Sequence, residues 1–403
     1  MDKHYLTPLF APQSIAVFAG RADDAAAQTR QARQLHEVLR AQRYGGELHF
    51  LDIDSSGKLA DLARASADLA LIALPPAEIA AALELAARMG CRAALVVGTG
   101  IGPEPADALK ALARREGIAL LGPNSLGLQR PSLQLNASVF GPLAAPGTLG
   151  LVSQSGALTV AMVDWARHNG VGFSSVVSVG AHTGLDIAEA LDFLAADGRT
   201  HSIIVYMEGI ASARRFISAL RTAAHSKPVV VLKSGRRADG NAAAQTHSGA
   251  IVGSDEVFDA ALRRAGAVRV RSFVELFSAA KCLASRYRPV GKRLAVISNG
   301  GGPGVLAADW AAEIGLELGH LSAESIAALA PKLSPHAALD ELIDLGEDAG
   351  PDEFEAALKS CATPKIISAT FRLPASRATW SISPPWMQRW PRLRAASCLA
   401  HRT

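Results

Sequence analysis

The chain has 403 residues, of which 49% are hydrophobic, and its formal net charge at pH 7 is +4. This length exceeds what one ordinary core fills, so two or three domains are expected, and the hydrophobic content excludes a disordered chain. The positive charge does not indicate a nucleic-acid partner, because the last 33 residues hold six arginines and no acidic residue. Without those six, 35 basic residues face 37 acidic ones.

The apolar runs and the cysteines exclude membrane spans and disulfide frameworks. The longest apolar runs, such as Ile203–Met207 and Pro228–Leu232, have the length of strands and fall short of the roughly 20 residues of a membrane helix. The N-terminus lacks the apolar segment of a signal peptide. The four cysteines form no CxxC pair, so we predict no metal site and free thiols; they are Cys91, Cys282, Cys361 and Cys398. We expect a cytoplasmic protein that binds neither nucleic acid nor membrane.

Short β-branched runs alternate with amphipathic Ala/Leu-rich stretches, a pattern typical of βαβ units and parallel sheets. A first doubly wound domain is predicted over residues 6–131. Its predicted strands are Ser14–Phe18, Glu47–Leu51, Leu69–Ala73, Ala93–Val97 and Ala119–Leu120. Its predicted helices include Thr29–Gln42, Ala77–Met89 and Pro105–Glu116.

A loop containing Pro142, Pro146 and Gly147 leads to a second predicted α/β domain, residues 145–288. Its predicted strands are Leu149–Ser153, Phe173–Ser178, Ser202–Tyr206 and Pro228–Lys233, and its helices Ala157–His168, Ile187–Ala196 and Ala211–His225. A third domain is expected over residues 290–371, opening with strand Arg293–Ser298, turn Asn299–Gly304 and helix Val305–Ile314. This domain offers too few strands for a complete sheet.

Residues 372–403 form an irregular basic tail with Trp380, Trp386 and Trp390 among several prolines. No helical or strand period continues there. We interpret the tail as the product of a frameshift or truncation; a basic docking tail is the alternative.

The most specific local motif is Gln245–Asp255, which contains His247, Ser248 and Gly249. It follows the buried strand Pro228–Lys233, so its histidine is expected at the carboxyl side of a parallel sheet, where open α/β sheets bind ligands. The small residues around His247 leave room for a group as large as phosphate. Taken alone, these eleven residues favour the alternative of a surface loop with an ordinary histidine.

Ser153–Gly156 joins a predicted strand directly to a predicted helix. Serine hydroxyls, free backbone N–H groups and the positive end of the helix dipole are expected to meet there, as in anion-binding sites. The alternative is a serine-capped helix without a ligand. A nucleophile elbow is excluded, because Val152 and Gln154 occupy the positions that would need glycine.

Glu208 follows the predicted strand Ser202–Tyr206. An acid at this edge is able to accept a hydrogen bond from Nδ1 of a histidine and leave Nε2 nucleophilic. The alternative is a glutamate that points to water.

Three glycine-containing turns are weaker candidates. Leu121–Gly127 is expected to present Asn124 to a ligand, and Gly98–Gly102, with Thr99, is either a ligand turn or a mobile one. Asn299–Gly304 lacks the Lys-Ser/Thr of a P-loop and does not indicate nucleotide hydrolysis.

Seven motifs in one order resemble the NDP-forming acyl-CoA synthetases, which include ADP-forming acetate–CoA ligase and, more distantly, succinyl-CoA synthetase α subunits. The motifs are LFAPQSIAVF, LLGPNSLGL, GLVSQSGAL, IIVYMEGI, KPVVVLKSGR, THSGAIVGSDEVFDAALRRAG and SNGGGPGVLAAD. The resemblance covers about residues 6–360. It implies a Rossmann-like CoA-binding domain followed by succinyl-CoA-synthetase-like flavodoxin-type domains, the last incomplete.

The resemblance also implies the site residues. His247 matches the phosphorylated histidine and Glu208 the acid that orients it. The implied phosphate-binding residues are Ser153, Ser155, Gly156, Ser248 and Gly249. The implied residues for coenzyme A or acyl-CoA are Gly20, Pro75, Gly98, Thr99 and Asn124.

The implied partners are an ATP-grasp subunit or domain, which would supply the site for ATP or ADP with Mg²⁺, and a small carboxylic acid substrate. A homo-oligomer is compatible with the sequence. The chain departs from the family at Gly20–Asp24, where two aspartates stand near the expected CoA phosphates.

Two alternatives stay open. The first is the regulatory, acyl-CoA-binding half of a bacterial protein lysine acetyltransferase, which the Gly20–Asp24 turn favours and the presence of His247 with Glu208 opposes. The second is an NAD-binding Rossmann protein, which the missing GxGxxG opposes, although Asp52 or Asp54 stands where a ribose-binding acid would lie.

Overall fold

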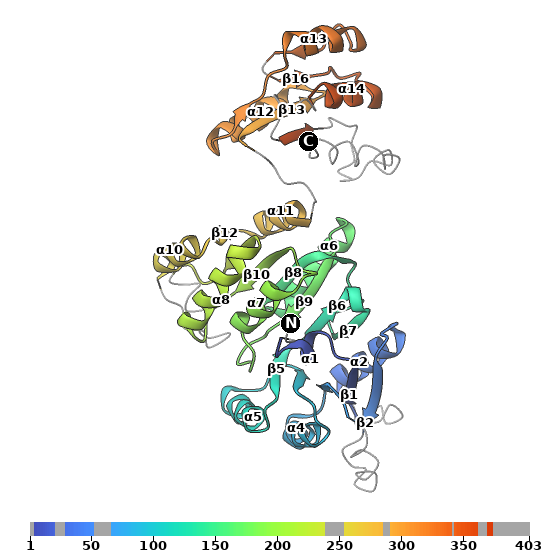
Figure 1. The fold of residues 1–403 in the computed structure, drawn as a ribbon, viewed down its shortest axis with the longest axis vertical. Helices are drawn as coiled ribbons and strands as arrows, with labels where there is room; N and C mark the ends of the chain where they lie inside the picture. Colours follow the sequence, from blue (N-terminus) through green and yellow to red (C-terminus); the bar gives the residue numbers. More distant parts are fainter. Residues whose placement is uncertain are drawn as a thin grey trace. The chain divides into compact units, whose positions relative to one another are not determined.

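A computed structural model describes residues 4–20, 29–51, 66–237, 254–284, 291–340, 342–361 and the backbone of 369–373. The chain divides into two compact units, Met1–Arg286 and Tyr287–Thr403 (Figure 1). Each unit is described by itself.

The first unit begins with a five-stranded parallel sheet in the order β2-β1-β3-β4-β5. Its strands are β1 (Ser14–Phe18), β2 (Glu47–Leu51), β3 (Leu69–Ile72), β4 (Ala93–Val97) and β5 (Ala119–Ser125). Its helices are α2 (Arg30–Ala41), the 3-10 turn η2 (Pro76–Glu78), α4 (Ile79–Arg88) and α5 (Pro103–Arg115). This is the doubly wound arrangement that the sequence predicts, and β1, β2 and β4 have the predicted bounds.

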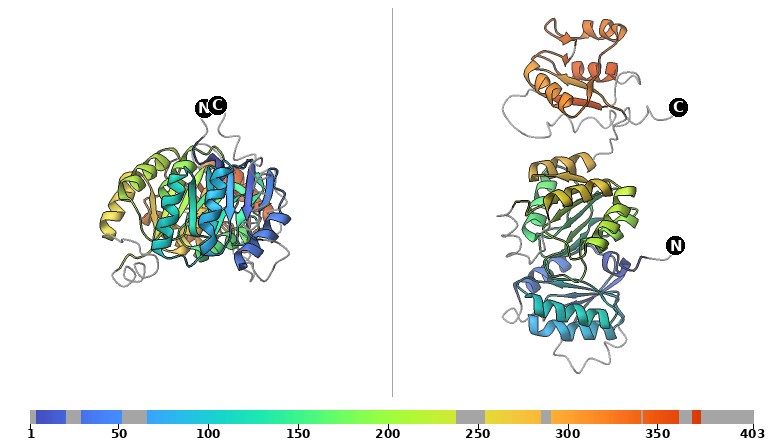
Figure 2. Two further views of the ribbon diagram at one scale, coloured as in Figure 1. Left: turned by 90° about the horizontal axis from the view of Figure 1, so that it is seen from below. Right: turned by 90° about the vertical axis from the view of Figure 1, so that its left-hand side faces the viewer.

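Helices on both faces bury the apolar strands of this sheet. Helices α4 and α5 cover one face and share a core with Ala16, Phe18 and Ile72 (Figure 2). Helix α2 covers the other face. It begins where Thr29 caps it, with the Thr29 hydroxyl accepting a 3.0 Å hydrogen bond from the Ala32 N–H.

The second sheet of the unit has the order β12-β11-β10-β8-β9-β6-β7. Its strands are β6 (Gly127–Arg130), β7 (Leu135–Ser138), β8 (Pro146–Ser153), β9 (Phe173–Ser178), β10 (Ser202–Met207), β11 (Val229–Lys233) and β12 (Val268–Val270). Its helices are α6 (Gly156–His168), α7 (Ile187–Ala196), α8 (Ala213–Ser226), α10 (Asp255–Ala265) and α11 (Phe273–Ala284). The predicted strands and helices of this region are present, each within a few residues of its expected ends.

The β6–β7 hairpin corrects the expectation of a plain loop between the two sheets. β6 pairs antiparallel with β9, so residues 127–138 form one edge of the second sheet. The hairpin is rich in buried polar groups: Gln129 Nε2 donates to Asn136 Oδ1 at 3.2 Å and to Ser138 Oγ at 3.1 Å. These bonds satisfy side chains that would otherwise be costly to bury.

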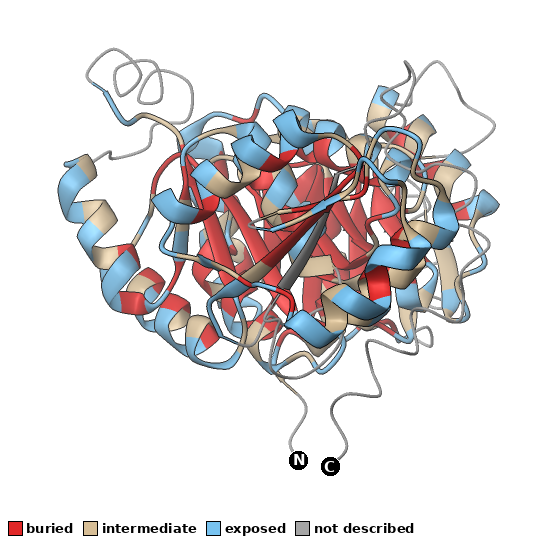
Figure 3. Ribbon diagram, turned by 90° about the horizontal axis from the view of Figure 1, so that it is seen from above, coloured by how far each residue is buried: buried red, intermediate tan, exposed pale blue. Residues whose placement is uncertain are grey.

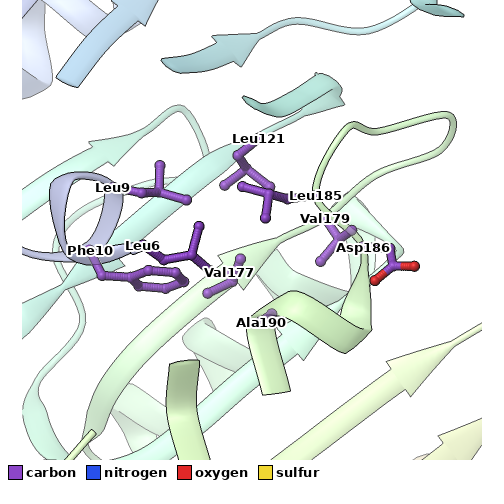
Figure 4. Close-up of a pocket in the computed structure, with 9 residues that line it drawn as sticks. All are labelled: Leu6, Leu9, Phe10, Leu121, Val177, Val179, Leu185, Asp186 and Ala190. Atoms are coloured by element: carbon purple, nitrogen blue, oxygen red, sulfur yellow. The ribbon is translucent and has the colours of Figure 1, made fainter. Parts of the chain in front are cut away.

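Helix α1 (Thr7–Phe10) joins the cores of the two sheets. Leu6, Leu9 and Phe10 belong to one apolar cluster that reaches from β1 to β10, and the Phe10 ring stacks on Phe193 with centroids 3.9 Å apart. A small apolar cavity remains beside α1 (Figure 4). It is lined by Leu6, Leu9, Phe10, Leu121, Val177, Val179, Leu185, Asp186 and Ala190. The Asp186 carboxylate accepts a hydrogen bond from the Ala188 N–H at the start of α7, so it is engaged in capping.

A buried ion pair fixes the far edge of the second sheet. Arg130 Nη1 lies 2.8 Å from Asp197 Oδ2 and 2.7 Å from Ser175 Oγ, and the two charged side chains are only 3% and 9% exposed. Burial raises the pKa of Asp197, but hydrogen bonds from Arg130 and the Arg130 charge outweigh it and leave this pKa below its ordinary value. Ion pairing therefore stabilises the fold above the ordinary pKa of about 4 and is lost as the pH falls through the lower, folded-state pKa.

We expect Asp197→Ala to destabilise the first unit by about 3–5 kcal/mol, because it leaves Arg130 buried without a counter-charge. Asp164→Ala, which removes an exposed partner of Arg167, should cost less than about 1 kcal/mol. Urea denaturation followed by circular dichroism measures both. Equal losses in the two variants would show that the buried pair has no special weight.

The second unit contains a smaller sheet around β13 (Arg293–Ser298), which pairs in parallel with β14 (Glu317–Leu318), β16 (Ile343–Asp344) and β17 (Ala369–Leu373). β15 (Ala338–Leu339) pairs antiparallel with β16. The helices are α12 (Gly301–Glu313), α13 (Ala323–Leu329), the 3-10 turn η4 (Ala330–Lys332) and α14 (Pro351–Cys361). Figure 3 shows buried residues concentrated in strands and on the inner sides of helices.

The structure corrects the predicted turn over Asn299–Gly304. Helix α12 already begins at Gly301, so Gly301–Gly304 lies in the first turn of the helix. Ser298 Oγ donates to the Gly300 carbonyl at 2.5 Å and accepts from the Gly300 N–H at 3.2 Å. The basic tail, from residue 374, lies outside the described residues, and the predicted domain limits stay predictions.

Candidate functional site

The second sheet changes direction between β8 and β10. The chain leaves β8 into α6, which packs on one face with Met162 and Val163, and leaves β10 toward α8, which packs on the opposite face with Phe216 and Leu220. The two connections diverge from adjacent strand ends, and open α/β sheets bind ligands in the crevice that such divergence creates. Tyr206 is paired with Ser153 in this register, so the residues that follow them meet at the crevice.

The β8 side of the crevice is the N-terminus of α6. Ser155 caps the helix, accepting from the Leu158 N–H at 3.4 Å, and the helix starts at Gly156, one residue before the predicted Ala157. Ser153 is buried, and its hydroxyl donates to the Ser155 carbonyl at 2.9 Å and accepts from the Ser155 N–H at 3.2 Å. The Ser153 hydroxyl therefore shapes the turn. The roles of Ser153, Ser155 and Gly156 in binding phosphate stay predictions.

The β10 side of the crevice carries Glu208. This residue is only 8% exposed, so the alternative of a glutamate pointing to water is wrong. The side chain of Gln154 crosses from the β8 side to the Glu208–Gly209 turn. Its Oε1 accepts from the Glu208 N–H at 2.6 Å and the Gly209 N–H at 3.2 Å, and its Nε2 donates to the Gly209 carbonyl at 3.0 Å.

The Tyr206 hydroxyl lies next to the Glu208 carboxylate and to Ser234. The pKa of Tyr206 is raised, chiefly because the side chain is buried; hydrogen bonding with Ser234 lowers it and the nearby Glu208 charge raises it. A neutral tyrosine hydroxyl thus remains available to hydrogen-bond a carboxylate near neutral pH.

His247, Ser248 and Gly249 lie outside the described residues, but both anchors of their segment are described and adjoin the crevice. On one side, β11 ends at the buried Lys233, and Met207 pairs with Lys233 in the neighbouring strand. On the other, Ser254 caps α10 by accepting from the Val257 N–H. Arg236 Nε lies 3.8 Å from Asp255 Oδ2, so the two anchors contact each other.

Positive charge is concentrated at these anchors. Lys233 Nζ donates to the Ser234 carbonyl at 2.8 Å and lies 5.4 Å from the centre of the Phe258 ring. Burial lowers the pKa of Lys233, Asp255 raises it, and Arg269 lowers it. Arg269 is buried and pairs with Asp255 and Asp259. A negatively charged group at the crevice would meet a favourable field here.

The first sheet has its own change of direction, between β1 and β3. Gly20 follows β1 with φ of +67°, and Pro75 follows β3 and precedes η2. The Thr29 hydroxyl at the start of α2 donates to the Ala73 carbonyl at 3.3 Å, which brings the N-terminus of α2 to the same crevice. Gly20 and Pro75 therefore border one crevice, and their role in binding CoA stays a prediction; Asp23 and Asp24 lie outside the described residues.

Gly98 and Thr99 follow β4 on the same edge. Thr99 is exposed, and a Cβ added to Gly98 would meet no atom within 4 Å, so this turn borders open space; the role of both residues in binding CoA stays a prediction. The structure corrects the prediction that Asn124 is presented to a ligand. Rather than facing a ligand, its Oδ1 accepts from the Ile101 N–H at 2.9 Å, and its Nδ2 donates to the carbonyls of Ile101 at 2.8 Å and Ala181 at 3.2 Å. Asn124 holds the ligand turn and links it to the loop after β9.

We expect Asn124→Gly to weaken CoA binding about tenfold, because the loss corresponds to one or two hydrogen bonds that fix the Gly98–Gly102 turn. Glycine keeps the positive φ of +64° without strain. Isothermal titration with CoA measures the change. Asn169→Ala, which removes an equivalent side-chain bond at the end of α6, is the control and should bind CoA normally.

No role at the candidate site was predicted from the sequence for Gln154, Tyr206 or Lys233. Lys233 carried a signal, since it is a single charge at the carboxyl end of an apolar strand. Gln154 and Tyr206 carried none, because their importance arises from contacts between separate strands.

Among the described residues, no group of three or more His, Cys, Asp and Glu side chains is arranged to hold a metal ion. None of the described helices combines the length and apolar character that crossing a bilayer requires.

Comparisons with known proteins agree with this architecture. Residues 146–283 match the succinyl-CoA ligase like flavodoxin domain. ADP-forming acetate–CoA ligase I of Archaeoglobus fulgidus is 36% identical over 298 residues, which are 72% of this chain and 43% of that protein. The α subunit of ADP-forming acetate–CoA ligase I of Pyrococcus furiosus is 35% identical over 299 residues, 72% of this chain and 64% of the subunit. The chain thus spans less than two thirds of these relatives.

A solved structure resembles most of the chain. The dinucleotide forming acetyl-coenzyme A synthetase 1 of Ca. Korarchaeum cryptofilum, in complex with phosphate and ADP, superposes with a TM-score of 0.83 at 28% identity, covering 93% of this chain and 82% of that one. The α subunit 1 of ADP-forming succinate–CoA ligase of Archaeoglobus fulgidus is 30% identical over 233 residues, 55% of this chain and 78% of the subunit.

The first unit contains two successive sheets, and a serine-capped helix and a buried acid stand at the strand crevice of the second sheet. These features define the class of CoA-ligase-like α/β proteins. Within that class, the chain belongs to the NDP-forming acyl-CoA synthetase family.

Proposed function

We propose that this chain is the CoA-binding, phosphohistidine-carrying portion of an acid–thiol ligase of the ADP-forming acetate–CoA type. One observation carries the proposal: the α6 N-terminus and the buried Glu208 meet at one crevice, and β11, the strand beside β10, leads from there into the segment that contains His247. A carboxylate, a helix terminus and a histidine are the groups that phosphoryl transfer to imidazole needs.

The reaction proceeds in two steps on this chain. A phosphate oxygen attacks the thioester carbonyl of acyl-CoA; the C–S bond breaks, and CoA leaves as the thiol after taking a proton. Nε2 of His247 then attacks the phosphorus of the acyl phosphate; the bond between phosphorus and the acyl oxygen breaks, and the carboxylate leaves. Glu208 accepts the hydrogen bond from Nδ1 and stabilises the positive charge on the ring. The backbone N–H of Gly156 and the positive end of the α6 dipole stabilise the phosphoryl oxygens.

CoA binds in the crevice of the first sheet, at Gly20, Pro75, Gly98 and Thr99, with Asn124 supporting the turn. ATP or ADP with Mg²⁺ binds to an ATP-grasp partner that exchanges the phosphoryl group with His247. The substrate is a small carboxylic acid, and the protein acts in the cytoplasm. The relatives named as α subunits support the requirement for a partner chain.

We expect the purified chain to acquire an acid-labile, base-stable phosphate label from acetyl-CoA and labelled phosphate. His247→Ala should abolish the label, and Glu208→Gln should slow labelling at least about 100-fold, since the acid holds the imidazole in the reactive tautomer. His225→Ala and Glu275→Gln change exposed residues of the same unit and should label normally. A label that survives in His247→Ala would contradict the proposal.

The Gly20–Asp24 sequence favours a second candidate, an acyl-CoA-binding regulatory module without turnover. The same experiment separates the two. Saturable acyl-CoA binding without any label, also in the presence of ATP and a separately expressed ATP-grasp partner, would establish the regulatory module.

A further inference from the structure

The side chain of Gln154 is the direct link between the two sides of the β8–β10 crevice. The chain diverges on leaving these strands, so pairing between them ends at Tyr206 and Ser153. Beyond that point the Gln154 N–H donates to the Tyr206 carbonyl at 3.1 Å, and the Gln154 carboxamide reaches the Glu208–Gly209 turn. Gln154 thus continues the strand pairing into the crevice by means of a side chain.

A carboxamide suits this place because it mimics a peptide group. Oε1 accepts from two successive N–H groups, of Glu208 and Gly209, while Nε2 donates to the Gly209 carbonyl. A carboxylate would set a second acceptor against that carbonyl, and an apolar side chain would leave both buried N–H groups without these bonds.

The neighbours of Gln154 are fixed as well. Ser153 on one side closes a hydrogen-bonded turn with Ser155 on the other, and Ser155 caps α6. The N-terminus of α6 and the backbone of Glu208 are therefore connected through the hydrogen bonds of three consecutive residues, Ser153, Gln154 and Ser155.

We propose that Gln154 is a positioning residue: it sets the Glu208 carboxylate at a fixed place relative to the α6 N-terminus, and phosphoryl transfer to His247 depends on that spacing. The inference rests on the proposed function and adds to it the residue that couples its two halves. Gln154 acts through Glu208 and contacts no reacting atom. CoA binding, in the crevice of the other sheet, does not depend on Gln154.

The test is a double-mutant cycle on the full chain, read out as the rate of His247 labelling from acetyl-CoA and labelled phosphate. Gln154→Leu is expected to slow labelling by at least about tenfold, the usual effect of removing a residue that orients a catalytic group. In the Glu208→Gln background the same change should have little further effect, because the group that Gln154 positions is already disabled. The CoA dissociation constant, measured alongside, should stay close to that of the wild type, whereas the melting temperature should fall to a similar extent in both backgrounds, because the same two N–H groups lose their acceptor.

Gln42→Leu is the matched control. Gln42 Oε1 accepts from the Asn136 N–H at 2.7 Å, so this glutamine also bridges two elements, but away from the crevice. It should label at the wild-type rate. Should Gln154→Leu fail to fold, Gln154→Glu keeps the side-chain length, removes the donor to Gly209 and is expected to change labelling in the same direction.

The outcomes separate the two ideas. A wild-type labelling rate in folded Gln154→Leu would overturn the role of Gln154 and leave the proposed function standing. Equal slowing by Gln154→Leu in both backgrounds would show that Gln154 does not act through Glu208. A wild-type chain that takes no label would overturn the proposed function, and this inference with it.

Discussion

Parallel pairing of β8 with β10 is the constraint on which the candidate site depends. Because Ser153 stands level with Tyr206, the first turn of α6 and the acid after β10 arrive at the same height on the sheet edge. A shift of one residue in this register would turn every side chain of a strand to the opposite face and separate the two groups. The apolar strands that flank the pair, buried on both faces, hold the register.

Two arginine side chains buried in the first unit have defined acidic counterparts. Arg130 and Asp197 pair at the far edge of the second sheet, and Arg269 pairs with Asp255 and Asp259 beside the crevice. Lys233 differs from these, since its ammonium group donates hydrogen bonds to the carbonyls of Ser234 and Gly235. The positive charge of Lys233 is therefore less fully neutralised by adjacent acids, so it can attract an anion nearby.

The sequence allowed most of the fold to be predicted, because continuous apolar runs with turn residues between them define a parallel sheet. β1, β4 and β9 have the predicted ends. The β6–β7 hairpin escaped prediction, since Gln129 and Asn136 look like loop residues until their hydrogen bonds to each other are known. Periodicity records which residues are apolar and carries no information about polar groups that satisfy one another across strands.

The same limit applies to the candidate site. The Ser155 cap was foreseeable from local sequence, whereas the hydrogen bond that holds the Glu208 backbone is accepted by Gln154, more than fifty residues earlier. Asn124 was expected to face a ligand, but contacts with Ile101 and Ala181 hold it to the backbone. His247 stays a prediction, supported by the anchors of its segment.

The contact between Arg236 and Asp255 has a consequence for how this family can vary. A segment whose two ends already touch costs the sheet little closure entropy, and that cost grows only slowly with the length in between. A change in sequence or length between Arg236 and Asp255 is therefore expected to cost β11 and α10 little stability as long as this contact is kept. Chemistry at the crevice can in this way be gained or lost independently of the scaffold that surrounds it.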